Sequence, residues 1–208
     1  MRTEKDALID RLLLLYAVER GNHFGHMDGP FKLMKIPLMA ELDSAEESVS
    51  SFNYTFFRYQ HGPITTEIYE DARVLRELGL LDLPEHGKGT IKLTEKGIHL
   101  LKSIEGLYAE NEVVCKYVAE SAKANAPLAF GVLKKRVYNR TVDTCGGKMK
   151  IGDLPFYCDV VSKLEGDNVL RFQLDDDWLD TLWGEFHYSD EEKAQMQRIR
   201  PMAAFAAD

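Results

Sequence analysis

Apolar residues recur at intervals of three and four positions through the first part of the chain. Over residues 5–19 this spacing predicts a helix whose core-facing side holds Leu8, Ile9, Leu12, Leu15 and Tyr16. Gly21 supplies the C-terminal stop. A second apolar helix is predicted around residues 31–42. Pro37 lies inside that helix, and because proline removes a backbone hydrogen bond, we expect residues 31–36 to form a separate turn.

Aromatic and polar residues then alternate at positions 52–59, which predicts a short strand. The His-Gly-Pro sequence at residues 61–63 ends the strand, and Pro63 suits the first turn of a third helix. Helical spacing continues as far as Gly79, at Ile64, Ile68, Ala72, Leu75 and Leu78. The third helix is therefore predicted over residues 64–78.

Two extended segments flank a glycine-bearing turn at residues 84–89, which predicts a β-hairpin over residues 80–93. Thr94 suits the N-cap of the next helix, because its hydroxyl can accept from a free N–H group of the first turn. Helical spacing then extends to about residue 125, with a break near Gly106.

A further helix is predicted over residues 128–140, followed by a polar turn at 143–147. The pattern beyond this turn is weaker. Residues 154–157 and 168–174 are compatible with a strand or a docked arm, and residues 190–199 predict a final helix.

Together these elements predict a mainly α protein with a small β-hairpin, which is an α+β fold. Three helices, the last leading into a glycine-tipped hairpin, follow the order of a winged helix-turn-helix, which we assign to residues 1–95. Residues 96–142 form a helical extension, and residues 143–208 form an acidic, irregular C-terminal region. Because winged-helix proteins commonly pair through an appended helix, the extension is a candidate homodimer element.

The N-terminal half also resembles a known family. The resemblance is carried by Phe31 to Ile36, Phe52 to Tyr59, His61 to Ile64, Glu67 to Asp71 and Leu75 to Leu81. These residues are similar to the YwgA-like and SocA-like (Panacea antitoxin) winged-helix group, over roughly residues 5–100. The resemblance implies a regulatory or antitoxin-type module that acts through protein contacts rather than catalysis. Pro37 departs from the family pattern.

Charge is segregated along the chain. The net charge of −8 opposes non-specific attraction to a polyanion. Residues 1–122 hold 14 basic and 20 acidic side chains, residues 123–150 hold 7 and 1, and residues 151–208 hold 5 and 13. The middle segment is therefore the strongly basic part of the chain.

Other features restrict the function classes. The sequence has no secretion signal and no apolar run of membrane length, and its three cysteines do not form a disulfide framework, so we expect a cytoplasmic protein. His23 and His26 lack a third well-spaced metal ligand, and no nucleophile stands in a catalytic motif. We therefore expect a binding protein, with no catalytic activity, metal or cofactor.

The first hypothesis is a DNA-binding transcriptional regulator. The third-helix residues best placed to reach bases are Thr65, Thr66, Tyr69, Arg73 and Arg76, and the predicted wing contacts are Lys88 and Lys92. The strongest cationic stretch is Lys134, Lys135, Arg136 and Arg140, with Lys148 and Lys150 beyond it. The aromatic residues of positions 52–59 are expected to pack in the core rather than stack on bases.

The second hypothesis is a protein-interaction module that docks a basic partner, for example a toxin. Four acidic residues of the third helix outnumber its two arginines: Glu67, Glu70, Asp71 and Glu77. Carboxylates repel phosphates, so this charge balance favours the protein partner. The usual function of the predicted fold favours DNA, which we place first.

Overall fold

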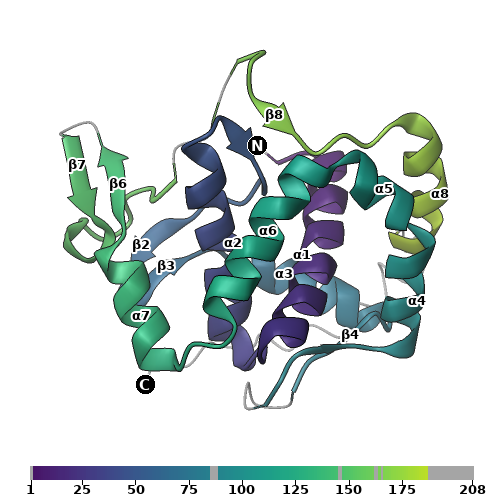
Figure 1. Ribbon diagram of the computed structural model, residues 1–208, viewed down its shortest axis with the longest axis horizontal. Coiled ribbons are helices and arrows are strands. Elements are labelled where there is room, and N and C mark those ends of the chain that lie inside the picture. The colour runs from purple at the N-terminus through teal and green to yellow at the C-terminus, as the bar shows by residue number, and fades with distance from the viewer. Residues whose placement is uncertain (1, 85–88, 145–146, 162–163, 165, 187–208) are drawn as a thin grey trace, which may run out of the picture. The chain divides into compact units, whose positions relative to one another are not determined.

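The computed structural model describes residues 2–84, 89–144, 147–161, 164 and 166–186 (Figure 1). Residues 1–174 form one compact unit, and residues 175–208 form a second unit that is described separately. The protein is mainly α, with short strands joined in pairs, as the sequence predicts. Within the described residues, no helix combines the length and apolar character needed to cross a membrane.

The first helix, α1 (Glu4–Phe24), is longer than predicted. Its N-terminus is closed by a capping box, in which Thr3 and Asp6 each accept from the other's backbone N–H. Gly21 does not end the helix, so that prediction is wrong. It is buried inside the last turns, where a Cβ atom would lie 2.3 Å from the Met27 sulfur, and the helix ends at Gly25 instead.

The second helix, α2 (Gly29–Ala45), runs without interruption through Pro37. The predicted separate turn at residues 31–36 is therefore wrong. The physical reason is tertiary packing: α2 lies against α1 and α6, and nearly all of its residues are buried. The Ser121 hydroxyl also donates to the Ile36 carbonyl beside the proline, at 2.7 Å.

Residues 52–59 alternate as predicted, because Phe52, Tyr54 and Phe56 are buried. Only the end of the segment pairs: β2 (Phe57–Tyr59) forms an antiparallel hairpin with β3 (Gly62–Ile64). Gly62 makes the turn with a φ of 108°, in the region that favours glycine. Pro63 therefore lies in a strand rather than in the third helix, which begins only at Glu67.

The third helix, α3 (Glu67–Glu77), buries Ile68, Asp71, Ala72 and Leu75 and exposes its opposite face. It leads into β4 (Leu81–Asp82), which pairs antiparallel with β5 (Lys92–Leu93), so the predicted hairpin is confirmed. The Thr94 cap is also confirmed, since its hydroxyl accepts from the Gly97 N–H at 3.0 Å.

The predicted long helix consists of three helices, α4 (Glu95–Ser103), α5 (Glu105–Glu110) and α6 (Glu112–Asn125). The break predicted near Gly106 is present at Ile104, and a second break, which was not predicted, lies at Asn111. Figure 1 shows α6 lying along α1 and α2, and it packs against both. The helix proposed for pairing two copies thus supplies core contacts within one copy. The domain boundaries predicted after residues 95 and 142 both fall inside the unit of residues 1–174.

The basic helix is confirmed as α7 (Phe130–Asn139), followed by a hairpin of β6 (Thr141–Thr144) and β7 (Gly147–Lys150) where a polar turn was predicted. A short 3-10 helix, η2 (Ile151–Asp153), comes next. Farther on, β8 (Leu170–Arg171) pairs parallel with β1 (Val49–Ser50). The second unit contains α8 (Asp176–Phe186), and the helix predicted at 190–199 lies outside the described residues.

A buried group of charges holds α3 against α1. Asp71 of α3 forms ion pairs with Arg2 and with Arg11, the latter at 2.9 Å, and accepts from the Tyr54 hydroxyl at 3.0 Å. Arg2 Nε also lies 2.7 Å from an Asp10 carboxylate oxygen, in ionic contact rather than hydrogen-bond geometry. Asp71 is 1% exposed, so its charge is neutralised by these partners rather than by water.

We predict that Asp71→Ala lowers the free energy of unfolding by about 3 kcal/mol, because it leaves two arginines partly buried without their shared anion. Glu70→Ala, at the exposed neighbouring position, is the control and should change the stability by less than about 1 kcal/mol. Urea unfolding of both variants measures the difference. Equal stability losses in the two variants would contradict the role given to Asp71.

Candidate nucleic-acid interface

The residues predicted to contact DNA at the third helix differ in exposure. Thr65 is 1% exposed, and its hydroxyl bonds locally with Glu67, accepting from the backbone N–H and donating to the carboxylate. It is therefore unable to contact DNA, and this expectation is corrected. Thr66, Tyr69, Arg73 and Arg76 are exposed.

The charge of the exposed α3 face is also more balanced than the sequence count indicates. Asp71 points inward to its arginine partners, so it adds no negative charge to the surface. Glu67 accepts from the Thr55 N–H at 2.8 Å, and Glu77 lies 3.9 Å from the Arg73 guanidinium. This face is neither strongly acidic nor basic.

The basic stretch lies on α7 and β7, which follow each other closely along the chain. We give the name α7 surface to its basic residues Lys134, Lys135, Arg136, Lys148 and Lys150. In α7 only Leu133 and Val137 are buried, so Lys135 and Arg136 are exposed and Lys134 is half-buried. All of β7 is exposed, and alternate residues of a strand share a face, which places Lys148 and Lys150 together.

Arg140 does not belong to the α7 surface, although it was predicted there. Its guanidinium lies 2.7 Å from carboxylate oxygens of both Asp43 and Glu46. These ion pairs join the end of α7 to the end of α2, so the positive charge of Arg140 is balanced within the fold. Arg136 makes a lighter contact, donating to the Ala124 carbonyl at 3.0 Å while remaining exposed.

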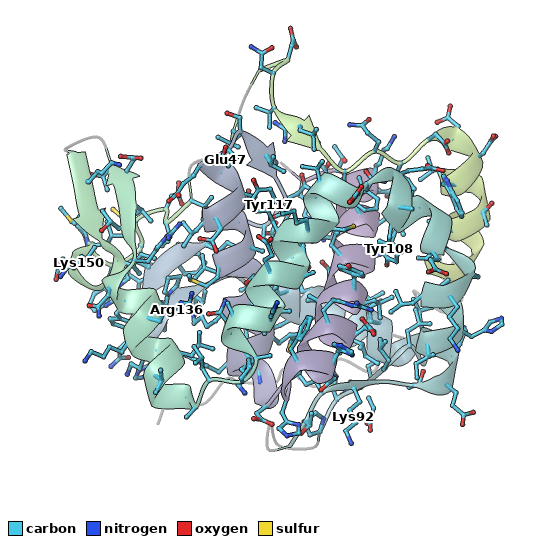
Figure 2. The ribbon with its side chains drawn as sticks, in the orientation of Figure 1. Glu47, Lys92, Tyr108, Tyr117, Arg136 and Lys150 are labelled. Atoms are coloured by element: carbon cyan, nitrogen blue, oxygen red, sulfur yellow. The ribbon has the colours of Figure 1, made fainter. Side chains whose placement is uncertain are left out.

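The α7 surface and the predicted wing are separate. Lys92 of β5 is exposed, but Figure 2 shows it well away from Arg136 and Lys150. Lys88, the other predicted wing contact, lies outside the described residues. Of the wing residues that the structure describes, Lys92 therefore lies apart from the α7 surface.

Beneath the α7 surface lies a row of cations and aromatic rings. Lys134 lies 5.6 Å from the ring centre of Tyr138, and the guanidinium of Arg58 lies 5.0 Å from the same ring. Arg58 also lies 5.3 Å from the ring of Phe156 and donates through Nε to the Ile151 carbonyl at 3.0 Å. Sequence reasoning missed this row, because its members are far apart along the chain.

A hollow lies apart from the α7 surface, among α1, α4, α5 and α6, with a volume of about 730 Å3. Tyr16 and Tyr108 stack within it, at 4.9 Å between ring centres. Its charged residues balance in sign: Glu19, Glu105 and Glu112 against Arg20, Lys102 and Lys116. Burial raises the pKa of the Cys115 thiol there to about 12, so this thiol is protonated at neutral pH and a poor nucleophile.

Comparisons of the chain with protein-family models, with curated proteins and with solved structures found no match in any of the three. The resemblance to the winged-helix antitoxin group therefore stays a prediction.

Lys35, close to the row of cations and rings, is buried at the base of the β2–β3 hairpin. Its ammonium donates to the Pro63 carbonyl and lies 5.4 Å from the Phe31 ring. Burial, with the nearby positive charge of Arg58, lowers the pKa of Lys35 to about 7.

This pKa makes stability depend on pH. Between pH 7 and the ordinary lysine pKa of 10.5, the unfolded chain binds more protons at Lys35 than the folded chain does. The contribution of Lys35 to stability therefore rises with pH in that window, and it is lowest below pH 7. We predict that wild type gains about 2 kcal/mol relative to Lys35→Met between pH 7 and pH 9.

Urea unfolding of both proteins at several pH values measures this difference. The Asp10 carboxyl, whose pKa burial raises to about 8, gives the opposite slope between pH 4 and 8, but it is present in both proteins and cancels. Parallel pH profiles for the two proteins would contradict the assignment.

Proposed function

We propose that this protein is a DNA-binding regulatory protein that holds the phosphate backbone with its α7 surface. The observation that carries the proposal is the basic segment 123–150, with seven basic residues against one acidic, which leaves Lys135, Arg136, Lys148 and Lys150 exposed on α7 and β7. Phosphate contacts by lysine and arginine supply most of the sequence-independent affinity for DNA.

The charge of the remaining chain supports an oriented approach. Apart from residues 123–150, the chain is acidic on both sides of the segment, by 6 and by 8 charges. A polyanion is repelled by this part and attracted by the α7 surface, which favours one docking orientation. The α7 surface takes the role that the sequence assigned to the third helix and the wing.

We predict that replacing Lys135, Lys148 and Lys150 together by Ala weakens duplex binding. The slope of log affinity against log salt should fall by about 2 to 3, because each lost phosphate contact removes about 0.9 from it. Fluorescence anisotropy over a series of salt concentrations gives the slope.

The matched control replaces three exposed lysines outside the α7 surface, Lys5, Lys102 and Lys116, by Ala. It removes the same net charge and should leave most of the slope intact. Equal losses in the two triple variants would reduce the effect to overall charge and contradict the proposal.

The α3 face favours a second function, the docking of a protein partner. Tyr69 is 39% exposed, and charges of both signs surround it on the helix. Tyrosine and arginine are enriched at protein interfaces, whereas a DNA-reading helix needs an excess of cations. A partner that docks here would leave the α7 surface free.

We predict that Tyr69→Ala weakens binding of such a partner by about tenfold or more, whereas Tyr117→Ala, on α6, leaves it unchanged. Partners captured from nuclease-treated lysate with wild type are the test set. Proteins captured equally by wild type and Tyr69→Ala would exclude the α3 face as their docking site.

A further inference from the structure

Two large aromatic side chains are exposed together on one face of β2. Tyr59 and Tyr157 are 39% and 72% exposed, and their rings lie 5.9 Å apart. We call these two residues the aromatic platform. Grouped apolar exposure of this kind marks an interaction site more often than an isolated exposed residue does.

The backbone beneath the platform is held on both sides. Strand β2 pairs with β3 along one edge, and residues 157–160 bond to its other edge. The Tyr157 N–H donates to the Arg58 carbonyl, and the Arg58 N–H donates to the Cys158 carbonyl, each at 2.7 Å. The platform therefore stands on a hydrogen-bonded ladder rather than on a free loop.

Tyr157 adopts a conformation that disfavours its side chain. Its φ of 66° lies in the left-handed region, which costs free energy for any residue except glycine. This conformation accompanies the largest exposure of any large hydrophobic residue in the described part of the chain. The strained backbone at Tyr157 therefore does not bury the ring. Backbone outliers of this kind cluster at functional positions.

The platform stands beside α7 at the end of β2. The Tyr138 hydroxyl of α7 donates to the carbonyl of Gln60, the residue after Tyr59, at 3.4 Å, and the Lys134 ammonium lies 5.6 Å from the centre of the Tyr138 ring. Phe156 lies on the other face of β2, against Arg58, because side chains alternate along a strand. Exposed aromatic rings and the basic helix α7 therefore meet at the end of β2.

We propose that the aromatic platform stacks unpaired bases of a single-stranded nucleic acid whose phosphates lie on the α7 surface. The inference rests on the proposed function, since it assigns the form of nucleic acid bound at the same surface. Bases within a duplex are stacked on one another and offer no free face, whereas a single strand offers both base faces and phosphates. Exposed aromatics beside lysines match that combination.

Fluorescence anisotropy with labelled strands of about 12 nucleotides tests the proposal. The probes are single-stranded DNA, single-stranded RNA of the same sequence, the DNA duplex, and an abasic strand that keeps the phosphates but lacks the bases. The variants are Tyr157→Asn, Tyr59→Ala and the control Tyr117→Ala. Asparagine tolerates the left-handed conformation, so Tyr157→Asn removes the ring without imposing backbone strain. Thermal melting confirms that each variant is folded.

We expect the wild type to bind at least one base-bearing single strand more tightly than both the duplex and the abasic strand. Tyr157→Asn and Tyr59→Ala should each weaken that binding by between about 5-fold and about 100-fold, and leave abasic binding unchanged. Tyr117→Ala should alter neither. Comparing DNA with RNA shows which strand the platform accepts.

Three results would overturn the inference. If wild type binds abasic and base-bearing strands equally, the bases are not stacked, although the α7 surface still holds phosphates. If the duplex is preferred and the platform variants bind normally, the single-strand assignment fails while the proposed function stands. If no probe binds, both proposals fail, and the platform is left to a protein partner.

Discussion

The candidate interface depends on the buried guanidinium group of Arg58. This single side chain of β2 contacts the Tyr138 ring of α7, the Ile151 carbonyl of η2 and the Phe156 ring. Its backbone N–H donates to the Cys158 carbonyl and its own carbonyl accepts from the Tyr157 N–H, while Pro63 of β3 lies opposite it. A guanidinium is planar and weakly hydrated, so it can lie between aromatic faces at a lower cost than an ammonium. Arg58 thereby places α7, and the lysines it carries, beside the aromatic platform.

Charge in this protein serves two purposes that the sequence does not separate. Arg2 and Arg11 share the Asp71 carboxylate, and Lys35 donates to a backbone carbonyl in the core. These charged side chains bond to partners within the fold. Lys135, Lys148 and Lys150 remain exposed, so their charge reaches a ligand. Only the basic residues that stay exposed without a partner in the fold can therefore bind a ligand.

Local patterns predicted the elements well where the elements are stabilised locally. Helical spacing identified the helices, alternation identified the buried rings of Phe52, Tyr54 and Phe56, and the Thr94 cap follows from the hydroxyl at a helix start. The elements β5 and α4 were predicted from the residues of their own segment. Predictions failed where packing overrides the local preference, as at Gly21, which lies against Met27, and at Pro37 within the packed α2.

The sequence by itself therefore determined the helix-rich class, the hairpin after the third helix and the presence of one basic segment. Only the tertiary structure decided that Thr65 and Asp71 turn inward, that Arg140 is paired with Asp43 and Glu46, and that Tyr157 turns outward. The physical reason is that helix and strand periodicity follow from neighbouring residues, whereas the use of a charge or a ring depends on partners that the chain brings in from far along its length.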